Sequence, residues 1–487
     1  MNRSKRVARE IIYWLLIAVL LTAGGFLLFT HLGETGISDC DEARHGINAY
    51  EMLQSGDYVV STYRGETDYW NLKPPLTYYC ILLGYQLFGF SAFSMRFYSA
   101  LSMLATMILM ALWMKKRYGS VASLFCQLFW LGCAMVYGPH FARFGDADAQ
   151  MLFFYVAAML CMLESPKNLK WLYGSALCFG LAFMSKSWHA ALIPVTCFVF
   201  VCVTGMIRKL RLRHYLLLIF FGLLPIMPWA IARFMRDGMA FFKLSFTVDV
   251  GARATTVHEG HFGDTLYYVH HLLQDPACVL AMLLGAAAFV RKAIMRTRLT
   301  TDQIGVLAWF LLPLLLYSAC VSKLAWYIFV SLPALAVSLG MLAAKLCECR
   351  GSKLPGAVCL ALAGSLLIFC GTGNWQDVSS QSNEDTYQRI LLDYFDRDAD
   401  SGTKIYIQYE SENAYRSVNY RNWVMDDELT ALLAGDLVCV DGGSEAFMEE
   451  EEHAYLLCHD LGMKYELLEE YPIVSEEGHV MLIENLN

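Results

Sequence analysis

Long runs of hydrophobic residues, separated by short polar or basic segments, occupy the first three quarters of the chain. A helix needs about 20 apolar residues to cross a bilayer. The pattern therefore predicts eleven membrane-spanning helices, near residues 11–31, 95–114, 119–138, 148–164, 171–185, 188–206, 214–234, 267–290, 303–321, 326–345 and 355–372. Residues 404–409 and 436–440 instead alternate apolar and polar positions between helical stretches, which indicates a small α/β domain.

The predicted fold class is a membrane all-α domain, residues 1–373, followed by a C-terminal α/β domain, residues 374–487. The run at 11–31 follows basic residues, as in a signal peptide, but its length and the later spans favour a membrane anchor. Residues 74–90 open with two prolines and are rich in Tyr and Gly. They favour a helix in the membrane plane, within a first external loop of residues 32–94.

Basic residues between the predicted spans indicate the orientation. If eleven helices cross the membrane, the N-terminus and all the basic segments lie on the same side of it; these segments are 115–117, 167–170, 208–213, 291–298 and 345–353. The positive-inside rule makes that side cytoplasmic. The first external loop and the C-terminal domain would then lie outside the plasma membrane.

Composition supports two environments. The chain is 57% hydrophobic and 17% charged, with a mean hydropathy of +0.41, whereas soluble domains are about 45–50% apolar. Residues 374–487 hold 26 Asp and Glu against 6 Lys and Arg, a net of −20, so the rest carries +12 of the total −8. The sixteen cysteines show neither a disulfide scaffold nor a zinc spacing. Cys439 and Cys458 either pair or remain free thiols.

Ionisable residues gather in the first external loop. Asp41, Glu42 and Arg44 directly follow the first span, and Lys73 precedes a double proline. One interpretation is a general base beside a phosphate ligand. The other is helix-capping acids and a lysine that reaches lipid headgroups.

Further charges stand at other predicted outer ends. Arg143, Asp146 and Asp148 precede or begin the span at 148–164, where capping by one Asp does not explain the whole group. Lys186 and Lys323 lie at two more external junctions. We expect each of these two lysines to contact either an anionic ligand or a lipid headgroup.

A second loop contributes histidines. His258 and His261 are spaced for a metal ion on a helix, but adjacent glycines favour a loop in which His261 hydrogen-bonds or faces a phosphate. Glycoside hydrolysis needs two carboxyl groups, one of them protonated. A sugar phosphate instead needs positive charge as its phosphate departs. One base with several cations therefore favours sugar transfer from a lipid phosphate.

Seven motifs occur in order between about residues 31 and 340: Asp41-Glu42-Ala43-Arg44, Gly56-Asp57-Tyr58-Val59, Lys73-Pro74-Pro75-Leu76, Ala142-Arg143-Phe144-Gly145-Asp146-Ala147-Asp148-Ala149, Gly180-Leu181-Ala182-Phe183-Met184-Ser185-Lys186, Glu259-Gly260-His261 and Ser322-Lys323-Leu324-Ala325-Trp326-Tyr327. Together they resemble the GT-C glycosyltransferases of the protein O-mannosyltransferase and aminoarabinose-transferase group. The resemblance implies a GT-C fold, an undecaprenyl- or dolichyl-phosphate sugar donor and an active site under the first external loop.

The resemblance also implies roles for individual residues. Asp41 would be the general base, Asp148 would line the same cavity, and Arg44 and Lys73 would bind the donor phosphate. The other candidate substrate ligands are Glu42, Arg143, Asp146, Lys186, His261, Lys323 and Tyr327. Direct displacement would invert the anomeric carbon.

This sequence departs from the aminoarabinose branch at two positions. That branch has a Glu before its Lys-Pro which, with a His, can hold a metal; Leu72 stands there in this chain. The sequence therefore supports no metal or other cofactor, although a divalent ion is possible. His189 stands where relatives usually carry small residues.

We therefore expect a plasma-membrane glycosyltransferase. Its acceptor would be an extracytoplasmic lipid, protein or polymer, and no nucleic-acid partner is expected. The alternative is a transporter or flippase of lipid-linked sugars, for which midplane charges and paired repeats are typical; the sequence shows neither. A receptor whose tail binds a ligand would leave Asp41, Lys73 and Asp148 unexplained.

Overall fold

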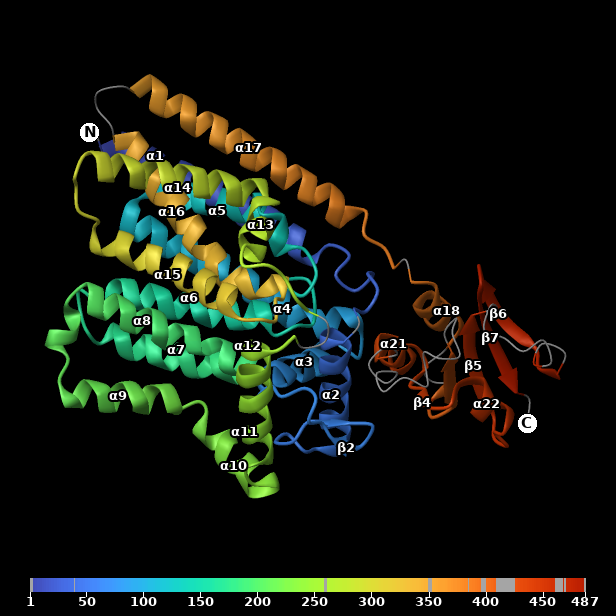
Figure 1. The fold of residues 1–487 in the computed structure, drawn as a ribbon. Helices are drawn as coiled ribbons and strands as arrows, with labels where there is room; N and C mark the ends of the chain where they lie inside the picture. Colours follow the sequence, from blue (N-terminus) through green and yellow to red (C-terminus); the bar gives the residue numbers. More distant parts are fainter. Residues whose placement is uncertain are drawn as a thin grey trace.

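The computed structural model describes residues 3–38, 40–257, 261–348, 353–383, 385–395, 400–408, 425–459, 467 and 470–485. Long helices lie side by side in one bundle, and the C-terminal domain stands at one end of it (Figure 1). Residues His258 and Glu259 of the predicted motifs lie outside the described residues.

Each of the eleven predicted spans contains an α-helix, although several of them also contain a break or a 3-10 turn. The long helices are α1 Arg3–Phe29, α4 Ala92–Tyr118, α5 Ser120–Gly132, α6 Asp148–Glu164, α7 Trp171–Lys186, α8 Leu192–Val203, α9 Leu212–Leu223, α10 Met227–Asp237, α14 Pro276–Ile294, α15 Thr301–Ala319, α16 Leu332–Glu348 and α17 Lys353–Ser379. Among the described helical segments, seven are long and apolar enough to cross a membrane, or eight if α9 and α10, bent by 60°, form one span. The chain is a multi-pass membrane protein.

The stretch from α7 to α8 is a hairpin. Ser175 Oγ of α7 lies 3.3 Å from Cys197 Sγ of α8, which a straight helix would place far apart at 1.5 Å per residue. The chain reverses at η2 Ser187–Ala191, where Ser187 has a φ of 52°. This reversal brings Lys186 to the end of the hairpin, as the sequence predicts for the 185–188 junction.

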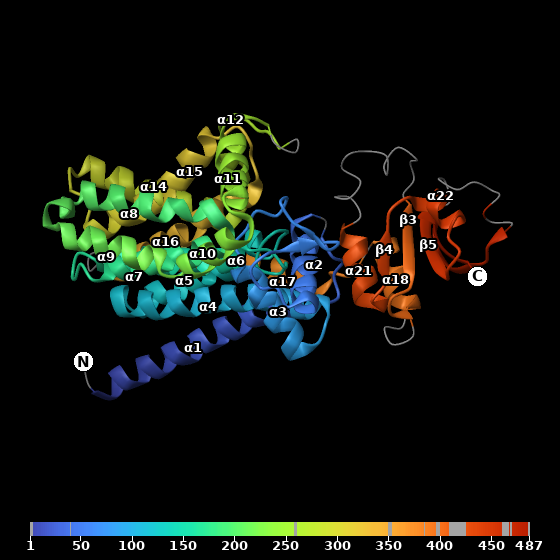
Figure 2. The ribbon, with the colours of Figure 1, turned by 90° about the horizontal axis from the view of Figure 1, so that it is seen from below.

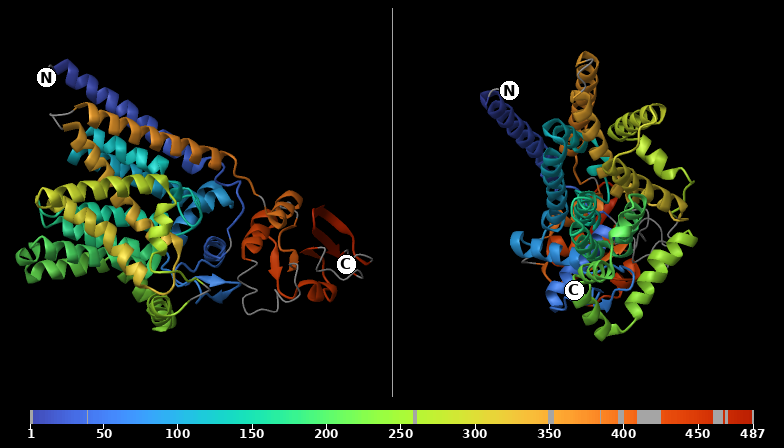
Figure 3. Two further views of the ribbon diagram at one scale, coloured as in Figure 1. Left: turned by 45° about the horizontal axis from the view of Figure 1, so that its top comes forward. Right: turned by 90° about the vertical axis from the view of Figure 1, so that its left-hand side faces the viewer.

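Lipid must cover the outside of the bundle. The helices α1 (Figures 2 and 3) and α17 (Figures 1 and 3) lie along its outer side. Large apolar side chains there face outward, including Leu15, Val19, Leu362 and Phe369, each more than half exposed. An apolar surface of this extent is stable against acyl chains and costly in water.

The first external loop folds into its own small unit beside the bundle. It contains α2 Asp41–Ser55, the hairpin strands β1 Thr62–Tyr63 and β2 Glu66–Thr67, and α3 Leu76–Phe88. The helix α3 lies within the predicted 74–90 segment and packs on α2 and α4. Shorter connecting elements are η1 Ala134–Val136, η3 Met206–Lys209, α11 Ala240–Ser245, η4 Phe246–Ala252, α12 Arg253–Thr255, α13 Tyr267–Leu273 and η5 Ala325–Ser331.

The C-terminal domain is α/β, as predicted. Its described elements are α18 Thr386–Tyr394, β3 Lys404–Gln408, α21 Met425–Gly435, β4 Val438–Val440, α22 Gly443–Met448, β5 Ala454–His459, β6 Ile473–Glu477 and β7 Val480–Asn485. The sheet order is β4-β3-β5-β7-β6, with β3 parallel to both neighbours. Cys439 and Cys458 lie on strands on opposite sides of β3 and are not bonded to each other.

This domain docks on the first external loop through α21. The Glu428 carboxylate accepts hydrogen bonds from Tyr63 OH at 2.6 Å and from Arg64 Nε at 3.0 Å. The side-chain amide of Gln388 accepts a hydrogen bond from the Ile37 N–H and donates one to the Ile37 carbonyl. The loop is thus held between the bundle and the C-terminal domain.

Candidate active site

Asp41 and Lys73 form an ion pair at the edge of the first external loop. Lys73 Nζ lies 2.9 Å from Asp41 Oδ1 and 3.0 Å from Asn71 Oδ1. Asp41 is the first residue of α2, where the helix dipole favours a carboxylate. Lys73 is fixed by the two prolines that follow it and lead into α3. The side chains are 25% and 15% exposed, so a ligand can reach both.

The pair controls the charge of Asp41. Burial works to raise the pKa of Asp41, but Lys73 and, more weakly, Lys186 outweigh it and hold that pKa well below its usual range. Burial opposes protonation of Lys73, yet Asp41 raises the pKa of this lysine. Both groups are therefore charged at neutral pH.

A second ion pair joins the beginning of α6 to the end of α7. Lys186, the last residue of α7, donates to Asp148, the first residue of α6. Both side chains are about 95% buried. Lys186 Nζ also lies 5.8 Å from the ring centroid of Tyr327, within the range of a cation–π contact.

Asp146 and His140 lie beside these pairs. His140 Nδ1 lies 2.9 Å from Asp146 Oδ2, and its ring stacks on Trp326 with centroids 3.9 Å apart. Burial opposes protonation of His140, but the hydrogen bond to Asp146 raises its pKa above the usual value. His45 contacts Asp146 from the other side, at 3.6 Å. Burial, and then Lys73, lower the pKa of His45 to about 4, so this ring is neutral.

Four other predicted site residues form internal bonds instead. Arg44 donates to both carboxylate oxygens of Asp68, at 2.7 and 2.9 Å, and lies 3.5 Å from the Tyr63 ring centroid. Glu42 accepts from Arg96 at 2.7 and 2.8 Å, and both are fully buried.

The remaining two bond main-chain carbonyls. Arg143 donates to the carbonyls of Leu27 and Leu28 at the end of α1. Lys323 donates to the carbonyls of Tyr317, Ser318 and Cys320 at the end of α15. These contacts cap helix ends, where cations are stabilising.

His261 lies at the rim. Its carbonyl accepts from the Lys323 backbone at 3.3 Å, and its ring centroid is 6.5 Å from that of Trp326. The structure therefore brings together Asp41, Lys73, Asp146, Asp148, Lys186 and Tyr327, and places His261 near them. Four predicted site residues instead form internal hydrogen bonds that hold the fold together, namely Glu42, Arg44, Arg143 and Lys323.

Sequence reasoning missed several participants. Asp68 and Arg96, the partners of Arg44 and Glu42, belong to no motif. His140 lies six residues before Asp146 in a predicted external segment, and this position is the one sequence feature that points to a role in the site. Asp249 of η4 forms a pair with Arg253 at 3.8 Å, and its charge helps to raise the pKa of Lys73.

Metal binding has one geometric candidate here among the described residues. One ligand atom each of Asp41, His140 and Asp146 lies within 4.8 Å of the others. Lys73 already pairs with Asp41, and His140 bonds Asp146 Oδ2, whereas the buried Oδ1 of Asp146 has no hydrogen-bond partner among the described residues. Leu72 is buried against Met184 and Trp229, so the position before Lys73 offers no ligand.

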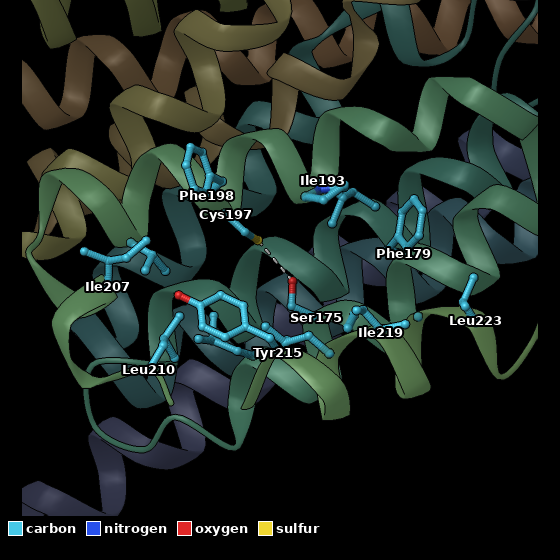
Figure 4. A pocket seen from close by; sticks show the side chains of 16 residues that line it. Ser175, Phe179, Ile193, Cys197, Phe198, Ile207, Leu210, Tyr215, Ile219 and Leu223 are labelled. Carbon is cyan, nitrogen blue, oxygen red and sulfur yellow. Dashed lines mark hydrogen bonds between the residues drawn. The ribbon is translucent and has the colours of Figure 1, made fainter. Parts of the chain in front are cut away.

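An apolar pocket lies among α7, α8 and α9 (Figure 4). Its volume is about 450 Å³, and its labelled lining includes Phe179, Ile193, Phe198 and Ile219. Almost all of its surface is apolar. The α7–α8 hairpin that forms two of its walls also carries Lys186 at its turn.

The chain is similar to known membrane glycosyltransferases in sequence and in fold. A family described as dolichyl-phosphate-mannose-protein mannosyltransferase matches residues 72–231. Two relatives bear the name undecaprenyl phosphate-alpha-4-amino-4-deoxy-L-arabinose arabinosyl transferase. The one from Aeromonas hydrophila is 30% identical over 348 residues, 68% of this chain and 60% of the relative. The one from Pseudomonas fluorescens is 29% identical over 340 residues, which are 66% of this chain and 59% of the relative. The chain thus spans about three fifths of these relatives.

Solved structures show the fold. ArnT from Cupriavidus metallidurans bound to undecaprenyl phosphate matches with a TM-score of 0.71 and 16% identity, over 100% of this chain and 99% of that one. The archaeal oligosaccharyltransferase AglB from Archaeoglobus fulgidus matches with a TM-score of 0.53 and 10% identity, over 93% of this chain and 70% of that one. The predicted GT-C fold and the resemblance to the aminoarabinose-transferase and O-mannosyltransferase group are confirmed.

Proposed function

We propose that this chain is an inverting glycosyltransferase that moves a sugar from a polyprenyl-phosphate donor to an extracytoplasmic acceptor. The observation that carries the proposal is the accessible Asp41–Lys73 pair at the edge of the first external loop, next to the Asp148–Lys186 pair. The names of the sequence relatives support a transferase that uses undecaprenyl phosphate.

The donor phosphate would be bound by Lys73 and Lys186. A sugar phosphate carries an acidic leaving group, so it needs cations rather than a protonating acid. Lys73 is the more accessible of the two, and Lys186 faces the same group of carboxylates. Arg44 and Lys323 act indirectly, because their donors are bonded to Asp68 and to helix carbonyls.

Asp41 would be the general base. When the donor phosphate draws Lys73 away, the carboxylate loses its counter-charge and its proton affinity rises. It then accepts the proton of the acceptor hydroxyl. The acceptor oxygen forms a bond to the anomeric carbon, while the bond from that carbon to the phosphate oxygen breaks and its electron pair leaves with the phosphate. Attack opposite the leaving group inverts the anomeric centre.

The apolar pocket suits part of the prenyl chain. Branched and aromatic side chains from three helices line it, so an isoprenoid chain would find surroundings there as apolar as the lipid that it leaves. Because α7 and α8 meet next to Lys186, a chain in this pocket can continue to a phosphate at Lys73.

The proposed orientation places this site outside the plasma membrane. The basic segments between helices favour a cytoplasmic N-terminus. The acidic C-terminal domain and the first external loop bond to each other, so both belong on the same, extracytoplasmic side.

The test is the Asp41→Asn variant in proteoliposomes that contain an undecaprenyl-phosphate-linked sugar and an extract of the cell envelope. Removal of a general base lowers turnover by about 10²–10⁴-fold, with donor affinity retained. Glu66→Gln is the matched control, since Glu66 is exposed in the same loop. Unchanged release of undecaprenyl phosphate in Asp41→Asn would remove the assigned base. Sugar that crosses the bilayer without transfer would favour a flippase instead.

Mass spectrometry of envelope lipids, glycans and proteins, with and without the enzyme, identifies the acceptor. Lipid, protein and polymer acceptors each give a distinct mass change. A loss of modification in Asp41→Asn cells links that acceptor to this site.

A further inference from the structure

Two thiols and a carboxylate meet where α5 ends and α14 begins. Cys133 is the C-cap residue of α5, Asp275 is the N-cap residue of α14, and Cys278 lies in the first turn of α14. The two cysteines are fully buried, and Asp275 is 3% exposed. One ligand atom of each lies within 4.8 Å of the others. None of the three takes part in the proposed transfer reaction.

The distance between the sulfur atoms suits a shared metal ion. Cys133 Sγ and Cys278 Sγ are 3.9 Å apart. Zinc binds thiolate sulfur at about 2.3 Å in a tetrahedron, which separates two sulfur ligands by about 3.8 Å. A disulfide would require about 2.05 Å. Two thiols at this separation therefore need little movement to bind one cation.

The carboxylate is oriented toward such a role. Asp275 Oδ1 accepts from the N–H groups of Ala277 at 2.9 Å and Cys278 at 3.1 Å, and Oδ2 accepts from Met135 N–H at 3.3 Å. Hydrogen bonds of this kind fix the position of a metal-binding carboxylate. Among the described residues Asp275 has no basic partner, so a cation would also supply the counter-charge that a buried carboxylate lacks.

The charges balance around a divalent ion. Two thiolates and one carboxylate around a 2+ cation give a net charge of −1, which the three N–H donors stabilise. Binding releases the two thiol protons. A third thiol, Cys370 of α17, lies close by: its Cβ is 3.4 Å from a Cβ built on Gly132, the residue before Cys133. Its sulfur lies outside the group of ligand atoms that are within 4.8 Å of one another.

We propose that Cys133, Cys278 and Asp275 bind a thiophilic divalent cation, with Zn²⁺ the best match to the donor set. The ion ties the start of α14 to the end of α5. It is a structural site, because its ligands are buried. It is independent of the proposed transferase activity.

The test measures metal directly on the full-length protein purified in detergent without chelator. Mass spectrometry of the metal content should give stoichiometric zinc, and exchange with Co²⁺ should give the near-ultraviolet charge-transfer band of a cobalt–thiolate site. Cys133→Ser and Cys278→Ser should each lose both signals. Cys126→Ser is the matched control, because Cys126 is equally buried in α5 and lies outside this cluster.

Either of two results would overturn the proposal. One is wild-type protein with neither bound zinc nor a cobalt–thiolate band. The other is a Cys133–Cys278 disulfide, found by peptide mapping without reductant. If the serine variants fail to fold, the two measurements on the wild-type protein still decide the question. Transferase activity is not the readout, so failure here leaves the proposed function untouched.

Discussion

Lys73 Nζ lies 2.9 Å from Asp41 Oδ1, so the proposed base is paired with a cation before any substrate arrives. A carboxylate held this strongly in its ionised form is a weak proton acceptor. The ion pair therefore keeps the Asp41 carboxylate ionised in the resting enzyme. It also links base strength to donor binding, since the same lysine is the proposed phosphate ligand.

Lys73→Ala should therefore change both donor binding and pH dependence. Loss of a charge-assisted hydrogen bond, about 1.5–3 kcal/mol, raises the donor KM roughly 10- to 100-fold. Without Lys73 the pKa of Asp41 rises, so more of the base is protonated at a given acidic pH. The acid limb of the kcat/KM profile then moves to higher pH.

Steady-state rates across a pH series check this prediction. Lys167→Ala, a change at an exposed lysine, should match the wild type. An unmoved acid limb in Lys73→Ala would show that the pair does not set the ionisation of Asp41.

Arg44→Ala should destabilise the protein rather than weaken donor binding specifically. Arg44 and Asp68 form a bidentate pair whose side chains are 8% and 0% exposed. Removal of one partner of a buried pair costs about 3–5 kcal/mol. Asp68→Asn in the same chain should restore part of the loss, because it removes the orphaned charge. Thermal unfolding in detergent, measured with and without donor, provides the comparison. A stable Arg44→Ala protein with a raised donor KM would assign the phosphate to Arg44 instead.

The helices could be predicted from the sequence because hydrophobic runs are a local property. All eleven predicted segments contain an α-helix, and the strands at 404–408 and 438–440 lie within the predicted alternating segments. The reversal at Ser187 follows the polar break in an apolar run. Continuous apolar length alone, however, did not reveal that α9 and α10 are bent by 60°.

The partners of charged residues could not be predicted in the same way. Asp68 lies 24 residues from Arg44, and Arg96 lies 54 residues from Glu42. Which cation faces the cavity and which is bonded internally depends on these distant contacts. Lys323 looked like an external cation, but its role as a cap becomes visible only when the end of α15 is placed. The motifs predict the region of the candidate site, and the packing shows which of its residues are bonded internally.

Glu428→Gln should loosen the docking of the C-terminal domain. Glu428 accepts from Arg64 at 3.0 and 3.1 Å and from Tyr63 at 2.6 Å. Burial, and then Glu428, raise the pKa of Tyr63, which keeps the phenol protonated as the donor. Loss of the charge weakens this contact by about 1–3 kcal/mol. Hydrogen–deuterium exchange should rise in α2 and α21, while exposed Glu451→Gln leaves it unchanged. Equal protection in both variants would show that apolar packing alone holds the domain.

Ala176→Phe should fill the apolar pocket and discriminate between donors. Ala176 lines the cavity among α7, α8 and α9. A larger ring there would exclude part of a long prenyl chain, so the KM for a long-chain donor should rise while that for a short-chain analogue stays the same. Leu283→Phe, at an exposed apolar position elsewhere in the bundle, controls for a general effect. An equal rise for both donors would place the prenyl chain elsewhere.

Transfer should persist after removal of divalent metal ions. Asp41, His140 and Asp146 are close enough to share a cation, but Lys73 and the His140–Asp146 hydrogen bond already satisfy their charges. The leaving phosphate has Lys73 and Lys186 to stabilise it, so a metal is not required for charge balance. Turnover in excess EDTA, with magnesium or manganese added back, measures this. A chelator-sensitive rate that either ion restores, and that His140→Ala abolishes, would instead make these three residues a metal centre and give Asp41 a different role.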